Sequence, residues 1–227
     1  DTLLDNGSYG LGNVTINNGV LTLTTKDDGI HADTIVTING GNIDVLTSYE
    51  GVEGNLIVVN GGSTTVFATD DGFNATYGSY NTPNMTVTDG YLDITSGTGD
   101  TDAIDSNGTY TQTGGFVVSR SALSGGMGGA LDTAGTVSIT GGTFIGIGQS
   151  ERVAPSSGDN QSTGLMNVNI TGGTYTVCDS NGNVMITFTT SNTYNYSYIW
   201  ISSNLLTRNT TYTLKRDGTT VKIWTQS

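Results

Sequence analysis

Val36 to Val45 read VTINGGNIDV, which is two short runs of alternating apolar and polar residues on either side of a Gly-Gly turn. The same unit recurs along the chain, and the last glycines of successive turns lie 21 to 31 residues apart. A period of this length, built from short strands without helical periodicity, is typical of a β-solenoid. The seven units begin at Val14, Val36, Ile57, Met85, Tyr110, Val137 and Val168.

These units predict an all-β fold, a right-handed parallel β-helix of about seven coils in which each unit is one coil. Alternation along the strands would place one apolar stripe inside and one polar stripe outside. The turns favour glycine because a sharp corner requires a positive φ. A β-sandwich also has short strands and glycine turns, and it is the alternative fold.

The pattern changes after residue 182, where the glycine turns stop and both tryptophans appear. We therefore expect residues 1–182 to form the β-helix with its metal-binding turns and residues 183–227 to form a β-rich cap packed on the last coil, within a single domain. Such a cap covers the open core and sheet edge of a solenoid. Four aromatic residues alternate on one face, which favours plugging the last coil over a sugar-stacking platform: Tyr194, Tyr196, Tyr198 and Trp200.

An acidic turn follows the second strand of each early unit. In a solenoid, aligned residues of neighbouring coils lie about 4.8 Å apart, so the aligned acids are expected to stack into a column. The five turns align as Asp27-Asp28-x-x-His31, Tyr49-Glu50-x-x-Glu53, Asp70-Asp71-x-x-Asn74, Thr101-Asp102-x-x-Asp105 and Gly128-Gly129-x-x-Asp132.

Carboxylates stacked this closely repel one another, and a divalent cation between them relieves the repulsion. Carboxylate and amide oxygens without cysteine favour Ca²⁺, whose oxygen ligands lie at about 2.3 to 2.6 Å, and more than one ion is expected. The alternative is a solvated acidic face that keeps the protein soluble. The predicted ligands are Asp27, Asp28, Asp33, Glu50, Glu53, Asp70, Asp71, Asn74, Asp102 and Asp105.

Seven Lys and Arg residues against twenty Asp and Glu residues give a net charge of −13. This charge disfavours nucleic acid or an anionic membrane surface as a direct partner, and no apolar run is long enough to insert into a bilayer. The single cysteine excludes an intramolecular disulfide and a cysteine-based zinc site. We expect a monomer.

The segments DDGIHAD (27–33), TINGG (37–41) and SYEGVEG (48–54) carry a resemblance to a known family. The sequence resembles bacterial extracellular carbohydrate-binding β-helix proteins of the clostridial cellulose- and polygalacturonate-binding type, which are similar in fold to family 9 polysaccharide lyases. The resemblance implies a protein that is extracellular or on the cell surface of a bacterium. It also implies calcium-dependent binding of acidic plant cell-wall polysaccharide (polygalacturonate or pectin), with cellulose as a further candidate ligand.

Two alternatives to this function remain. Lyases of the resembled kind use a basic residue, and Arg120 is the candidate here for a pectate-lyase-like β-elimination. The other alternative is a surface structural protein that calcium only rigidifies. In the binding hypothesis no residue is catalytic, and His31 and Arg120 are candidate sugar contacts.

Overall fold

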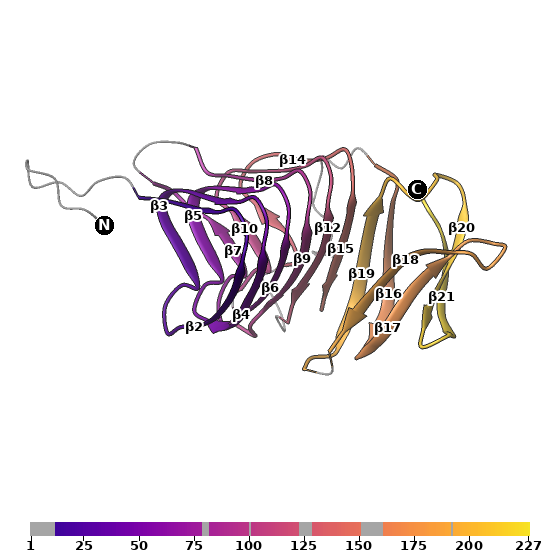
Figure 1. Ribbon diagram of the computed structural model, residues 1–227. Helices are drawn as coiled ribbons and strands as arrows, with labels where there is room; N and C mark the ends of the chain where they lie inside the picture. Colours follow the sequence, from indigo (N-terminus) through magenta and orange to yellow (C-terminus); the bar gives the residue numbers. More distant parts are fainter. Residues whose placement is uncertain (1–11, 79–81, 100, 123–128, 151–160, 192) are drawn as a thin grey trace, which may run out of the picture.

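The computed structural model describes residues 12–78, 82–99, 101–122, 129–150, 161–191 and 193–227. Throughout these residues the regular structure is β-strand, and the coils stack side by side from the indigo N-terminal end toward the orange and yellow cap (Figure 1). The predicted β-solenoid is confirmed. No helix long and apolar enough to cross a membrane occurs within the described ranges.

Two sheets form the solenoid, and their neighbouring strands run parallel up to β15. Sheet 1 contains β1 (Asn13–Ile16), β3 (Ile30–Ile38), β5 (Val52–Val59), β7 (Phe73–Ala75), β8 (Asn84–Val87), β10 (Ile104–Ser106), β11 (Thr109–Gln112), β13 (Asp132–Thr133) and β14 (Val137–Ile139). Sheet 2 contains β2 (Val20–Thr24), β4 (Asn42–Ser48), β6 (Ser63–Ala68), β9 (Tyr91–Ser96), β12 (Phe116–Ser121) and β15 (Thr143–Gly148), and continues into β19 (Tyr196–Ser203) and β16 (Thr163–Ile170).

Sheet 1 divides at β5, which pairs with two different strands. Residues 52–54 of β5 pair with β7, whereas residues 56–59 pair with β8. One arm then continues through β10 to β13 and the other through β11 to β14. Each full coil therefore has three short sides, and the arm of β7, β10 and β13 carries the acidic turns.

The predicted number of coils is slightly too high. Six strand–turn–strand units stack in parallel and make about five turns of the solenoid. The seventh unit, at 168–177, lies instead in β16 and β17 (Gly173–Cys178), which pair antiparallel with their neighbours. The change to antiparallel pairing thus comes at β16, before the predicted start of the cap at residue 183.

Apolar side chains from successive coils fill the solenoid interior. Val36, Ile57, Met85 and Tyr110, in consecutive coils of sheet 1, are fully buried in one cluster. They face the buried residues of sheet 2, such as Leu92 and Ile94. Burial of apolar surface in this single cluster is the main favourable term for the stacking of coils.

The glycine turns show the conformation that the sequence predicts. Gly41 and Gly62 have φ values of 101° and 84°, where an L side chain would be strained. An asparagine ladder ties adjacent turns together, because Asn39 Nδ2 donates to Asn17 Oδ1 (2.8 Å) and Asn60 Nδ2 donates to Asn39 Oδ1 (2.9 Å). Both features repeat from coil to coil and hold the register.

The cap covers the last coil in two ways. Trp200 on β19 is inserted into the interior cluster against Phe144, with ring centroids 5.4 Å apart, and Tyr198 packs on the same cluster. The other two aromatics predicted to plug the core, Tyr194 and Tyr196, lie in the second apolar cluster instead. β19 itself pairs antiparallel with β15 and covers the edge of sheet 2. Sheet 3 completes the cap with β17, β18 (Val184–Thr190), β20 (Thr211–Arg216) and β21 (Thr219–Thr225).

A separate apolar cluster joins the cap to the outer face of sheet 2. Val118, Ile145 and Ile147 point out of the solenoid and pack with cap residues such as Tyr175 and Phe188. The cap therefore lies against the side of the last coils as well as their end.

The acidic turns require a small residue on their inner side. A Cβ on Gly51 would clash with Val66 and with the carbonyl oxygen of Gly72 in the next coil, and a Cβ on Gly72 would clash with Ile94 and Ala103. These glycines let the acidic arm approach sheet 2 closely, so the positions of the carboxylates depend on them.

We predict that Gly51→Ala lowers the free energy of unfolding by about 1 to 3 kcal/mol, because the added methyl group overpacks this contact. Gly99→Ala is the matched control, since the one atom near a Cβ there would be the Cγ2 methyl of Thr101 at 3.3 Å, with no backbone contact. Chemical denaturation of both variants measures the difference. Equal stability of the two variants would contradict the close contact.

Candidate functional site: the carboxylate column

One row of polar side chains follows the acidic arm of sheet 1 in strict register. The strand pairing aligns residue with residue across five consecutive coils, so neighbouring members lie about one strand spacing, or about 4.8 Å, apart. We call this row A. Its members are His31, Glu53, Asn74, Asp105 and Asp132.

A second row, row B, lies three residues earlier in the turns. The main chain fixes it, because the N–H groups of Gly29, Gly51 and Gly72 donate to the carbonyl oxygens of the next coil at 2.9 to 3.0 Å. Row B consists of Asp28, Glu50, Asp71 and Asp102. The two rows have the register that aligning the acidic turns predicts, and together they form the carboxylate column.

Main-chain N–H groups orient the carboxylates of row B. Asp71 Oδ1 accepts the N–H of Asp102 at 2.7 Å, and Asp102 Oδ1 accepts the N–H of Gly129. Each of these side chains thereby lies over the next coil. Hydrogen bonds from main-chain N–H groups between neighbouring coils therefore fix both the register of the strands and the direction of these carboxylates.

The first group of possible metal ligands is Asp28, His31 and Glu53, whose ligand atoms all lie within 4.8 Å of one another. His31 Nδ1 is 2.8 Å from Asp28 Oδ2 and 3.6 Å from Glu53 Oε1. Asp33 is more exposed and lies 3.7 Å from the other ring nitrogen of His31. The lone histidine thus belongs to the column, and its predicted role as a sugar contact stays a prediction.

Glu50 occupies the middle of the column and is buried, with 9% of its surface exposed. Asn74 Nδ2 donates to Glu50 Oε1 at 2.8 Å. The other carboxylate oxygen, Oε2, and the amide oxygen of Asn74 are buried and receive no hydrogen bond from the described residues. A buried carboxylate oxygen without a donor is costly unless a cation meets it.

The second group of possible ligands is Asp102, Asp105 and Asp132, again within 4.8 Å of one another. Asp132 aligns with the acidic turns but is not among the predicted ligands. Its turn begins with two glycines, so it lacks the row B acid that marks the other turns. The strand register, Asp105 opposite Asp132, brings it into the column.

Burial and crowding raise the pKa values of the carboxyl groups in this column. Burial is the largest cause at every one of these groups, followed for Glu50 by the neighbouring Glu53 carboxyl. Other carboxylates of the column raise the pKa values of the remaining three. The pKa reaches about 8 at Glu50, about 7 at Asp71, about 8 at Asp102 and about 6 at Asp105.

Two predicted ligands lie beside the column rather than in these groups. Main-chain hydrogen bonds align Asp27, Tyr49 and Asp70, so the tyrosine separates the two acids. A side-chain hydrogen bond with Asp70 is the largest cause of a raised pKa at Tyr49. Their assignment as ligands is not supported by a shared cluster in the described part of the chain.

Arg120 lies on β12 in sheet 2, whereas the column follows the acidic arm of sheet 1. Its guanidinium forms an ion pair with Asp93 and donates to the carbonyl oxygen of Thr189. Neither partner belongs to the column. Arg120 therefore does not lie beside the carboxylates, and its predicted roles as a base or as a sugar contact stay predictions.

Comparison with known proteins bears on the N-terminal part of the chain. Residues 4–98 match the family model described as carbohydrate-binding domain-containing protein. This range includes the first four strand–turn–strand units and the column as far as Asn74. No curated protein and no solved structure matches the chain. The match supports carbohydrate binding as the class of function, and the more specific resemblance to the clostridial type stays a prediction.

The raised pKa values predict that the metal-free protein loses stability as pH rises. Unfolded carboxyl groups titrate near pH 4, whereas Glu50 and Asp102 keep their protons to about pH 8 in the folded state. The folded state therefore binds more protons between these values, and its stability falls across that interval. We expect the melting temperature in EDTA to be about 5 °C or more lower at pH 8 than at pH 5.

Calorimetric scans at several pH values check this. Added calcium should restore the melting temperature chiefly at pH 8, where the column is ionised. A metal-free protein that becomes more stable from pH 5 to pH 8 would contradict the buried position of these carboxyl groups.

Proposed function

We propose that the protein binds acidic polysaccharide through calcium ions held in the carboxylate column. The observation that carries this proposal is Glu50, a buried carboxylate in the middle of row B, whose Oε2 receives no hydrogen bond from the described residues. Carboxylate and amide oxygens are the ligands that calcium prefers in proteins. The residues present therefore fit a hard divalent cation.

Several residues would hold the ions. Asp28 and Glu53 would contribute at the N-terminal end of the column, and Asp102, Asp105 and Asp132 at the other end. Glu50 Oε2 and Asn74 Oδ1 are buried oxygens between the two groups and receive no hydrogen bond from the described residues. This division into groups is the reason to expect more than one ion. A bound cation would displace the proton that Glu50 shares with the Glu53 carboxyl in the metal-free protein. When bound, calcium supplies positive charge and open coordination positions to which a sugar carboxylate can bind.

The net charge of −13 explains why the cation matters for the choice of polysaccharide. A polymer of uronic acid carries a carboxylate on each sugar and would be repelled by this acidic surface. Calcium shared between protein and polymer carboxylates reverses that repulsion. The family match supports a carbohydrate partner, and the column supports polygalacturonate or pectin as the kind that calcium would bridge.

This function also suggests where the protein acts. Calcium sites of modest affinity are filled at the millimolar concentrations found outside cells. We therefore propose that the protein is extracellular or on the surface of a bacterial cell, where plant cell-wall polysaccharide is accessible.

Chelation is predicted to abolish binding of polygalacturonate. Affinity electrophoresis in gels containing polygalacturonate, run with calcium or with EDTA, measures the retardation directly. Asp105→Asn and Glu50→Gln should each weaken binding in calcium by at least about tenfold, because each removes a charge from the ion site. Asp44→Asn is the matched control, since Asp44 is partly exposed on β4, in the other sheet.

Binding that persists unchanged in EDTA would refute the bridging mechanism. If the two column variants melt at lower temperature but bind polygalacturonate like the wild type, the ions serve only to rigidify the solenoid. That result would also contradict the proposal.

A further inference from the structure

A groove opens on the outer face of sheet 2, where the solenoid meets the cap. It has a volume of about 340 Å³ and is lined by strands β6, β9 and β12 on one side and by residues 189–191, at the end of β18, on the other. This volume lies at the lower end of the range for small-ligand sites. It suits a ligand of one or two sugar rings.

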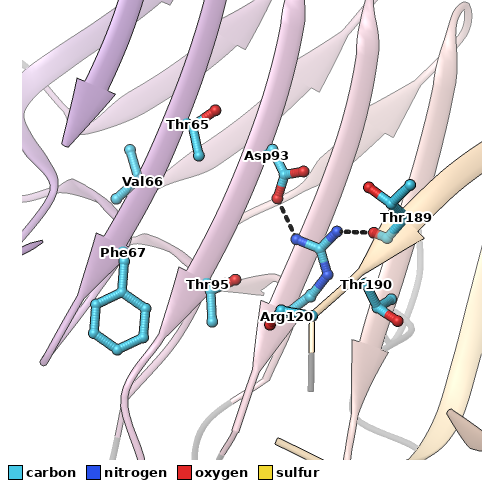
Figure 2. A pocket seen from close by; sticks show the side chains of 9 residues that line it. Thr65, Val66, Phe67, Asp93, Thr95, Arg120, Thr189 and Thr190 are labelled. Carbon is cyan, nitrogen blue, oxygen red and sulfur yellow. Dashed lines mark hydrogen bonds and ion pairs between the residues drawn. The ribbon is translucent and has the colours of Figure 1, made fainter. Parts of the chain in front are cut away.

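Two rows of side chains make the floor of the groove. The strand register places Thr65 beside Asp93, and it places Phe67, Thr95 and Arg120 side by side across β6, β9 and β12. The intervening residues Val66 and Ile94 are packed in the solenoid core. Alternation along the strands therefore turns the floor residues outward, as Figure 2 shows.

The positive charge of Arg120 and the negative charge of Asp93 neutralise each other in the groove. Arg120 is the one cation among the residues that line it, and its side chain is only 5% exposed. The guanidinium forms an ion pair with Asp93 and donates to the carbonyl oxygen of Thr189, as the dashed lines in Figure 2 mark. A ligand carboxylate would find no unpaired cation here and would meet the charge of Asp93.

Asp93 is held in place and remains reachable. Its side chain is 22% exposed, one oxygen accepts from Arg120, and the other accepts from the hydroxyl of Tyr91 at 3.2 Å. Burial raises the pKa of Tyr91 to about 12, so this hydroxyl keeps its proton and acts as the donor. Each carboxylate oxygen retains a second lone pair that can accept from a sugar hydroxyl.

The remaining lining residues of the groove suit an uncharged sugar. Thr65, Thr95 and Ser191 offer hydroxyl groups that can both donate and accept hydrogen bonds. Phe67 supplies an aromatic ring at the edge of the groove (Figure 2), and sugars present C–H groups that pack on aromatic surfaces. Apolar contact combined with a few oriented polar groups is the usual composition of a small-ligand site.

We propose that this groove is a second carbohydrate site, which binds an uncharged sugar residue of a neutral polysaccharide without calcium. It is separate from the carboxylate column, because its residues belong to sheet 2 and the cap, whereas the column belongs to sheet 1. The proposal goes beyond the calcium-dependent function and does not require it. The column would bind acidic polysaccharide through calcium, and the groove would bind neutral polysaccharide.

Isothermal titration calorimetry in EDTA tests the proposal on the full chain with cellohexaose, xylohexaose and mannohexaose as probes. At least one of these neutral oligosaccharides should bind. Phe67→Ala should weaken its affinity at least about tenfold by removing the aromatic contact. Thr65→Arg should do the same, because a guanidinium beside Asp93 would occupy the carboxylate and fill the groove.

Thr22→Arg is the matched control for the second variant, since Thr22 lies in the same row of sheet 2, two strands from Thr65, and is exposed. Leu46→Ala, at an exposed apolar residue of β4, is the control for the first. Both controls should bind like the wild type. Melting temperatures identify any variant that fails to fold.

The same proteins are then titrated with polygalacturonate oligomers in calcium, where the two groove variants should behave like the wild type. This separates failure of the groove from failure of the column. The groove proposal is overturned if none of the three neutral probes binds in EDTA, or if a probe binds and both groove variants retain wild-type affinity.

Discussion

The in-register hydrogen-bond ladder between coils is the constraint on which the rest of the structure depends. Once Glu53 is paired with Asn74, and Asn74 with Asp105, every equivalent residue of the repeat is stacked about one strand spacing from the next. Apolar positions then build one continuous core, and asparagines at the turns form a ladder. The same ladder obliges the acids of successive turns to approach one another.

In the acidic arm, the close approach of carboxylates lowers the stability of the metal-free fold but creates a site for a cation. Carboxylates such as Glu50 and Asp102 are partly or fully removed from water beside other carboxylates, and their raised pKa values record the cost of ionising them there. A fold optimised for stability alone would place threonine or asparagine at these positions, as it does along much of the outer surface. Local rules broken in this way are expected at functional sites.

Much of this arrangement is predictable because the repeat is local in sequence. The three-residue spacing between rows A and B, and the distance of each acidic turn from its glycine turn, are enough to align both rows from the amino-acid sequence alone. The column residue missing from the predicted ligands, Asp132, has glycines in place of the acidic pair that marks the other turns. Its alignment with Asp105 is the signal that could have found it.

The remaining features depend on contacts between distant segments. Residues 168–177 have the same strand–glycine–strand pattern as the true coils, but they pair antiparallel with cap strands, and a local pattern does not specify the partner of a strand. The groove likewise needs Thr189 from the cap to meet Arg120 from the solenoid. The sequence pattern alone is enough to place Asp93 and Arg120 as outward residues of adjacent strands. It is not enough to predict that residues 189–191 of the cap form the wall opposite them.

The central claim is that the ladder of carboxylates between coils is a calcium site. The most direct test is a crystal structure grown with calcium, with anomalous difference maps collected at long wavelength. The account predicts peaks between neighbouring coils at the two groups of ligands, coordinated by oxygens of Asp28 and Glu53 at one end and of Asp102, Asp105 and Asp132 at the other. Well-ordered carboxylates without any such peak along the column, at millimolar calcium and neutral pH, would contradict it.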